Sequence, residues 1–161
     1  MKTRYHQVFA RWMALNGRRR NCLSPDASHM IRRFTPRRKW SSYSRPNIER
    51  LMRMDLLGLI LPKVRPSVDG VISEPYVYPE DIILELKKDG TVWKNLQAFT
   101  EPYKRIRVSY INAARDRHVE FAKRLDSFIR KTRENRIIRG YGGVEIYYSQ
   151  EYSKWIRTCG R

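Results

Sequence analysis

The segment of residues 100–135 constrains the fold more than any other part of the chain, because apolar residues recur there every three or four positions in two successive stretches. This spacing predicts two amphipathic helices with a break near Arg117 and His118. Thr100 suits the N-cap of the first helix, since its hydroxyl can accept a backbone N–H, and Pro102 falls in the first turn, where its missing N–H costs nothing. The first stripe comprises Tyr103, Ile106, Tyr110, Ala113 and Ala114, and the second comprises Phe121, Leu125, Phe128 and Ile129.

Ten lysine and arginine residues lie between these two apolar stripes. Charged side chains are rarely buried, so the sequence predicts that all of them face outwards. We therefore expect two antiparallel helices that share a core and present a cationic surface. The ten residues are Lys104, Arg105, Arg107, Arg115, Arg117, Lys123, Arg124, Arg130, Lys131 and Arg133.

Shorter helical patterns precede this pair. Residues 46–54 have helical spacing, and Ser44 is the expected N-cap of that helix. Asp55 is then expected to cap a second, short helix over residues 56–61, which Pro62 ends because proline cannot continue a helix. This part of the chain therefore predicts two helices in quick succession.

The next stretch, residues 62–79, is rich in proline and predicts a loop wrapped over the body of the protein. Pro79 is expected at the first position of a further helix, with acidic residues in its first turn and Asp89–Gly90 at its end. Thr91 is the expected cap of the helix that follows, over residues 91–99. The sequence thus predicts two short helices before the long pair.

These patterns predict a mainly α fold, a small bundle of about five to six helices with little or no sheet. Residues 1–45 are expected to form an irregular basic arm containing a short helix and an extended segment, and residues 46–161 a helical domain. The glycine-rich residues 139–143 fit a helix terminator better than a phosphate-binding loop, because no GK[ST] follows them. A short amphipathic helix is expected over residues 144–155.

The charge of the chain is its least ordinary property. The sequence holds 34 lysine and arginine residues against 16 acidic ones, a net charge of +18, and the first 50 residues carry +11 of it. Such an excess favours polyanions, whether nucleic acid, anionic lipid or acidic protein, and does not distinguish them.

The basic arm supplies the candidate binding residues. Its aromatic residues alternate with cations, a pattern that suits single-stranded nucleic acid because bases stack on the rings while the cations follow the phosphates. The same pattern suits a docked loop with buried rings and exposed arginines, and a solvated cationic surface remains the third interpretation. The candidate contacts are Arg18, Arg19, Arg20, Arg32, Arg33, Arg37, Arg38, Lys39, Trp40 and Tyr43.

The sequence contains no recognisable catalytic or metal-binding pattern. Its three histidines are scattered, and Cys22 and Cys159 form no CxxC pair, so we expect free thiols in a reducing compartment rather than ligands. Apolar runs fall far short of the ~20 residues of a membrane span. We therefore expect a non-enzymatic protein without cofactors, and a cytoplasmic location, with an organellar address in the arginine-rich start as the alternative.

Two stretches resemble a known family. RRFTPRRKWSSYSRPNIERLMRM (Arg32–Met54) resembles the signature of the YdeI/OmpD-associated family, often labelled bacteriocin-protection proteins. The chain from Pro79 through LQAFTEPYKRIRVSYINAARDRHVEFAKRL to YGG is similar to that family's C-terminal helical module. The resemblance covers roughly residues 32–148. Longer members carry an α/β portion before the first motif, whereas only about thirty residues precede it here.

The resemblance implies a role in protection against antimicrobial peptides and an association with an outer-membrane porin, without any catalytic residue or cofactor to transfer. Our leading hypothesis is a stress or antimicrobial-peptide protection accessory that acts through a protein partner. The alternative is a basic module that binds nucleic acid, RNA or the ribosome through its arm. A weaker third option is an enzyme whose pocket formed with the missing N-terminal portion.

Overall fold

The structure, a computed structural model, describes residues 15–23, 30–36 and 42–140. It is mainly helical, as the sequence predicts, and its contacts divide the chain into two units, Met1–Glu74 and Pro75–Arg161. We describe each unit by itself. The boundary that we predicted after residue 45 stays a prediction.

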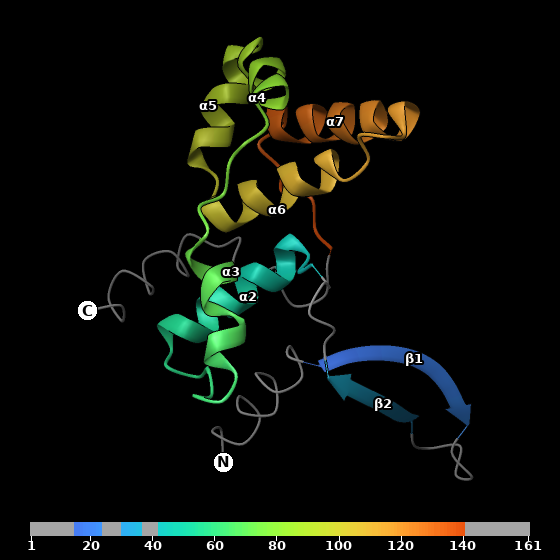
Figure 1. Cartoon of the computed structure of the whole chain (residues 1–161). Coiled ribbons are helices and arrows are strands. Elements are labelled where there is room, and N and C mark those ends of the chain that lie inside the picture. The colour runs from blue at the N-terminus through green and yellow to red at the C-terminus, as the bar shows by residue number, and fades with distance from the viewer. Residues whose placement is uncertain (1–14, 24–29, 37–41, 141–161) are drawn as a thin grey trace. The chain divides into compact units, whose positions relative to one another are not determined.

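The N-terminal unit contains a two-stranded antiparallel hairpin. Strand β1 (Leu15–Leu23) pairs with β2 (Met30–Pro36), and the register is irregular between Arg18 and Cys22 (Figure 1). The arm that we expected to be irregular therefore includes some regular backbone, and β2 coincides with the extended segment. The short helix expected before residue 15 lies outside the described residues.

Helix α2 (Arg45–Leu56) follows Ser44, which occupies the N-cap as predicted, although its side chain makes no capping hydrogen bond. The separate helix expected over residues 56–61 is wrong. Gly58 adopts a left-handed φ of +64°, and the Leu59 N–H returns to the Met54 carbonyl at 2.8 Å, so the chain turns away after one helix instead of starting another.

The proline-rich segment after α2 is more ordered than a loop. It contains the short 3₁₀ helix η1 (Arg65–Ser67) and helix α3 (Asp69–Ser73). Arg65 joins this segment to α2, with Nη1 2.5 Å from Asp55 Oδ1 and Nε 3.1 Å from Asp69 Oδ1. A small core lies beneath it, formed by Leu51, Met54, Ile60 and Val68, with Tyr43, Leu59, Val64 and Ile72 packed against it.

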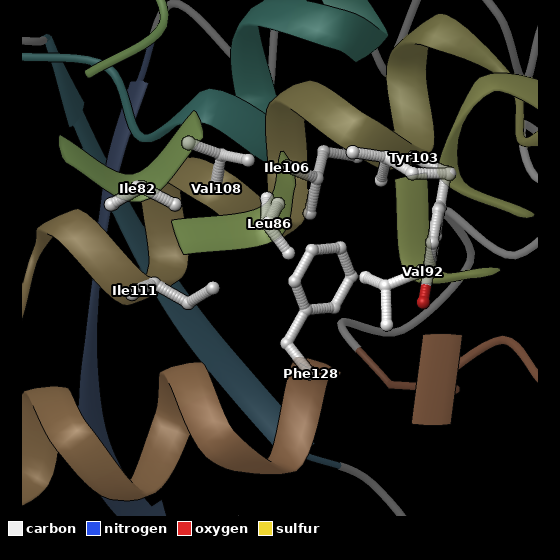
Figure 2. Packing of buried hydrophobic residues seen from close by; sticks show 9 residues of the cluster. Ile82, Leu86, Val92, Tyr103, Ile106, Val108, Ile111 and Phe128 are labelled. Atoms are coloured by element: carbon white, nitrogen blue, oxygen red, sulfur yellow. The ribbon is translucent and has the colours of Figure 1, made fainter. Parts of the chain in front are cut away.

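The C-terminal unit consists of four helices: α4 (Glu80–Lys87), α5 (Gly90–Ala98), α6 (Glu101–Asn112) and α7 (His118–Arg133). Helices α6 and α7 are the predicted pair and lie side by side, while α4 and α5 pack across them (Figure 1). Figure 2 shows side chains from all four helices converging on one core, in which the Phe128 ring of α7 lies near Leu86 and Val92. Helix α6 supplies four of the nine described buried residues of this core, more than any other helix of the unit.

Two of the predicted helix caps differ from the structure. Thr100 occupies the N-cap of α6 but makes no side-chain capping bond. Helix α5 is capped by Asp89, one of the two residues that we expected to end the previous helix, and not by Thr91. The Asp89 carboxylate accepts hydrogen bonds from the N–H groups of Thr91 and Val92 at 2.8 and 3.1 Å. Thr91 lies inside the first turn, where a side chain is not placed to cap these N–H groups.

Replacing this cap tests its contribution. The Val92 N–H, and then Arg133 with its Nε 2.8 Å from the carboxylate, hold the pKa of Asp89 below its usual value. Because the pKa is lowered in the folded protein, the Asp89 carboxylate contributes its full stabilisation above the ordinary carboxyl pKa. That stabilisation is lost as the pH falls through the lowered pKa. We expect Asp89→Ala to lower Tm by roughly 2–8 °C at pH 7 and by progressively less below pH 4.

The control for this experiment is Asp126→Ala, which removes an exposed acid from α7 that makes no ion pair within the described residues. Its Tm should stay close to that of the parent at pH 7 and at pH 2.5, because surface substitutions usually change stability little. A Tm loss in Asp89→Ala that is equally large at pH 2.5 and pH 7 would contradict a role for the ionised carboxylate.

The expectation that every cation of the long pair faces outwards is wrong at two positions. Lys104 and Arg107 are buried, because α6 is covered on several sides and not along one stripe. The predicted stripe also fails at Tyr110, which is exposed, with the Arg124 guanidinium stacked 3.8 Å from the centre of its ring. Tyr103, Ile106, Ala114 and Phe128 are buried as predicted.

Candidate functional site

Three helices of the C-terminal unit form a groove of about 410 Å³. Helix α4 contributes residues at helical spacing, and α5 and α6 each contribute further residues. Tyr78, in the segment before α4, also lines the groove. The lining residues are Tyr78, Glu80, Ile83, Leu84, Lys87, Trp93, Leu96, Gln97, Glu101, Lys104 and Val108.

The walls of the groove are largely apolar. Ile83 and Trp93 also pack against the unit's core, and they therefore hold the walls in place. Leu84, by contrast, is 56% exposed and presents its side chain at the surface. The Lys87 ammonium lies 5.1 Å from the centre of the Trp93 ring, a cation–π distance that fixes a positive charge at the rim.

Glu101 is the centre of a polar cluster at one side of the groove. Tyr78 Oη donates to Glu101 Oε2 at 3.0 Å, and Lys104 Nζ lies 2.5 Å from Glu101 Oε1. Burial acts to raise the pKa of Glu101, but the hydrogen bond and charge of Lys104 outweigh it, so the pKa lies below its usual value. Burial and then the Glu101 charge raise the pKa of Tyr78.

These protonation states fix the chemistry of the groove near neutral pH. Glu101 is a carboxylate already bonded to Lys104, and Tyr78 keeps its proton. Among residues 15–23, 30–36 and 42–140, no histidine or cysteine lines the groove, and no group of three or more histidine, cysteine or acidic side chains could hold a metal. The arrangement is suited to binding an amphipathic surface, with apolar walls and charges of both signs at the rim.

The candidate residues of the arm lie elsewhere. Arg18, Arg19 and Arg20 are in β1, and Arg32 and Arg33 are in β2. The register of the hairpin brings Arg18 opposite Arg33.

The remaining arm candidates divide into two groups. Tyr43 is half-buried against the small core of the N-terminal unit, which matches the docked-loop interpretation of that residue. The other four, Arg37, Arg38, Lys39 and Trp40, lie outside the described residues.

The cations of the long helical pair are distributed among acidic partners instead of forming one stripe. Arg115 binds both carboxylate oxygens of Asp81 at 3.0 Å and so joins the end of α6 to α4. Arg133 pairs with Asp89, and Lys131 Nζ lies 2.9 Å from Glu134 Oε2. Within the described residues, much of this charge therefore stabilises the helices.

Sequence reasoning missed the groove because its residues come from three separate helices. Ile83, for example, packs against the core and also lines the groove. One available signal was the adjacent Leu84, an apolar residue off the buried stripe.

The comparisons with known proteins agree with the resemblance noted in the sequence. Residues 75–137 match the family described as bacteriocin-protection, YdeI or OmpD-associated. This range contains all four helices of the C-terminal unit, so the match covers the part of the chain that holds the groove. Searches of curated proteins and of solved structures found no match. None of the described helices is long and apolar enough to cross a bilayer.

Proposed function

We propose that this YdeI/OmpD-associated protein is a non-enzymatic accessory factor in stress or antimicrobial-peptide protection, and that it acts by binding a protein partner in the groove between α4, α5 and α6. The family match over residues 75–137 supports the general role. The groove itself supports a binding mechanism, because it combines apolar walls with charged side chains, and its Glu101 carboxylate is already paired with Lys104.

The observation that carries the proposal is the exposure of Leu84 beside the Trp93 wall. A groove of this kind suits an amphipathic helix, which lays its apolar face between the walls and aligns its charges with the rim. The rim is also unusual for so basic a chain, since Glu80 and Glu101 balance Lys87 and Lys104. A partner helix with basic and acidic residues at its edges therefore meets no excess of like charge.

The alternative function, nucleic-acid binding, rests on the arm and not on this groove. The first 50 residues carry a net charge of +11, and the hairpin register pairs Arg18 with Arg33. Such binding would weaken steeply with salt, with log K roughly linear in log of the salt concentration. It would also be insensitive to changes in the groove.

We expect Leu84→Asp to weaken partner binding by about tenfold or more, because a charge placed among the apolar walls must be desolvated when the partner docks. The matched control is Val77→Asp, which makes an equivalent change at a residue that is 81% exposed and does not line the groove. Far-UV circular dichroism should show both variants folded, since both positions are exposed.

The measurement starts with capture of partners by the full chain, in parallel from untreated and nuclease-treated lysate, followed by purification of the captured protein and titration calorimetry. Complementation of a deletion strain exposed to antimicrobial peptides is the cellular readout. Leu84→Asp should bind the captured protein weakly and should not restore peptide resistance to the deletion strain. Val77→Asp should bind it normally and restore resistance. Loss of the captured protein on nuclease treatment would favour the nucleic-acid function, and equal behaviour of the two variants would contradict the groove.

A further inference from the structure

A second cavity of the C-terminal unit is lined by other residues of α6 than the groove. It has a volume of about 460 Å³ and is formed by α6, α7 and the segment of residues 138–140. Among the lining residues that the structure describes, four are cationic and none is acidic. The lining residues are Arg107, Tyr110, Ile111, Lys123, Arg124, Ser127, Phe128, Ile138, Arg139 and Gly140.

The two inner guanidinium groups are held in place by contacts within the protein. Arg107 is only 5% exposed, its Nη2 donates to the Ile138 carbonyl, and its guanidinium carbon lies 5.8 Å from the centre of the Tyr103 ring. Arg124 stacks on Tyr110, donates from Nη1 to the Tyr110 carbonyl at 2.7 Å, and pairs through Nε with Glu120 at 2.7 Å. Groups that are fixed before a ligand arrives lose little entropy on binding it.

The two outer cations are exposed at the cavity. Lys123 is on α7 one residue before Arg124, and Arg139 is in the segment that follows α7. Neither makes an ion pair with any acidic side chain of the described residues. Glu120 pairs with Arg124.

The base of the cavity is apolar. Ile111 and Phe128 belong to the unit's core, and Ile138 packs against it, while the Ser127 hydroxyl and the Tyr110 ring add polar and aromatic surface. The volume falls in the range of small-molecule sites, about 300–1,000 Å³. The combination suits a ligand with an anionic end and an apolar or aromatic body.

We propose that this cavity binds a small phosphate-bearing organic molecule. A phosphomonoester carries about −1.5 to −2 charges near neutral pH and three acceptor oxygens, which match several convergent cations better than a monocarboxylate does. Arginine presents a planar fork of donors suited to phosphate oxygens, and Lys123 adds a mobile point charge. This site is distinct from the partner groove, because none of the described residues lines both.

The test uses phenyl phosphate as the probe, with benzoate and inorganic phosphate as comparison anions, and measures binding to the full chain by titration calorimetry at low salt. We expect phenyl phosphate to bind at least about tenfold more tightly than either comparison anion. If benzoate binds as tightly as phenyl phosphate, the cavity does not select phosphate. If inorganic phosphate binds as tightly, the cavity does not recognise an apolar body. If phenyl phosphate does not bind, the cavity is not a binding site for such molecules.

Variants at the two exposed cations separate this site from the general positive charge of the chain. Lys123→Gln with Arg139→Gln should weaken phenyl phosphate binding about tenfold or more and leave the fold intact, since neither side chain is buried. The matched control, Lys94→Gln with Arg130→Gln, removes two exposed cations that do not line the cavity. An equal loss in both double variants would show that binding follows net charge, and would overturn the proposal.

Discussion

Replacing Phe128 by alanine should lower the free energy of unfolding of the C-terminal unit by about 3–5 kcal/mol, the usual cost of truncating a buried phenylalanine. The Phe128 side chain is 1% exposed, and it extends from α7 into the core formed by α4, α5 and α6 (Figure 2). Its ring centre lies 6.2 Å from that of Tyr103. The variant therefore loses aromatic contacts as well as buried area, and it leaves a cavity where four helices meet.

The measurement is urea denaturation followed by far-UV circular dichroism, with hydrogen exchange of α6 amides to confirm that the C-terminal unit is affected. Val119→Ala is the matched control, because Val119 lies on the same helix and is 70% exposed. We expect its unfolding free energy to change by no more than about 0.5 kcal/mol. A loss below about 1 kcal/mol in Phe128→Ala would contradict the central position of this residue.

The burial of Phe128 could be predicted from the sequence, because the buried residues of an amphipathic helix repeat with the helical period. The same argument correctly placed Tyr103 and Ile106 in the core. It also gave the break before α7 and the mainly helical fold. Local spacing is enough for these conclusions, since each depends on one helix and the face that it buries.

Lys104 and Arg107 show where that reasoning stops. A pattern along one helix assumes a single buried stripe, but α6 contacts neighbours on several sides, so even charged positions become covered. Long side chains tolerate this because their alkyl stems pack against apolar surface while the charged ends find acceptors. Those acceptors are Glu101 for Lys104 and the distant Ile138 carbonyl for Arg107, and sequence spacing does not reveal the second.

Tyr110 is the opposite case. Its position in the stripe predicted burial, but Arg124 of the next helix stacks on its exposed ring instead. The groove and the cationic cavity were unpredictable for the same reason, since each is lined by residues from segments that meet only in the folded unit. The arm residues that the sequence favoured for binding stay a prediction.

Releasing the segment after α7 should have the second large effect on stability. The Ile138 N–H donates to Tyr103 Oη at 3.0 Å, and the Ile138 carbonyl accepts from Arg107 Nη2. Both backbone groups of one residue are therefore held by side chains of α6. We expect Arg107→Ala to lower the free energy of unfolding by about 2–4 kcal/mol and Tyr103→Phe by about 1–2 kcal/mol, because each leaves a backbone group without its partner.

If the two side chains act together on Ile138, their effects are not additive, because the first substitution already loosens the segment that the second would release. The double variant should then fall short of the summed losses by at least about 0.5 kcal/mol, and either single variant should speed hydrogen exchange of the Ile138 amide. Tyr110→Phe, on the same helix but exposed, is the control and should leave that exchange rate unchanged. Strictly additive losses with unaltered Ile138 exchange would show that Tyr103 and Arg107 stabilise α6 separately.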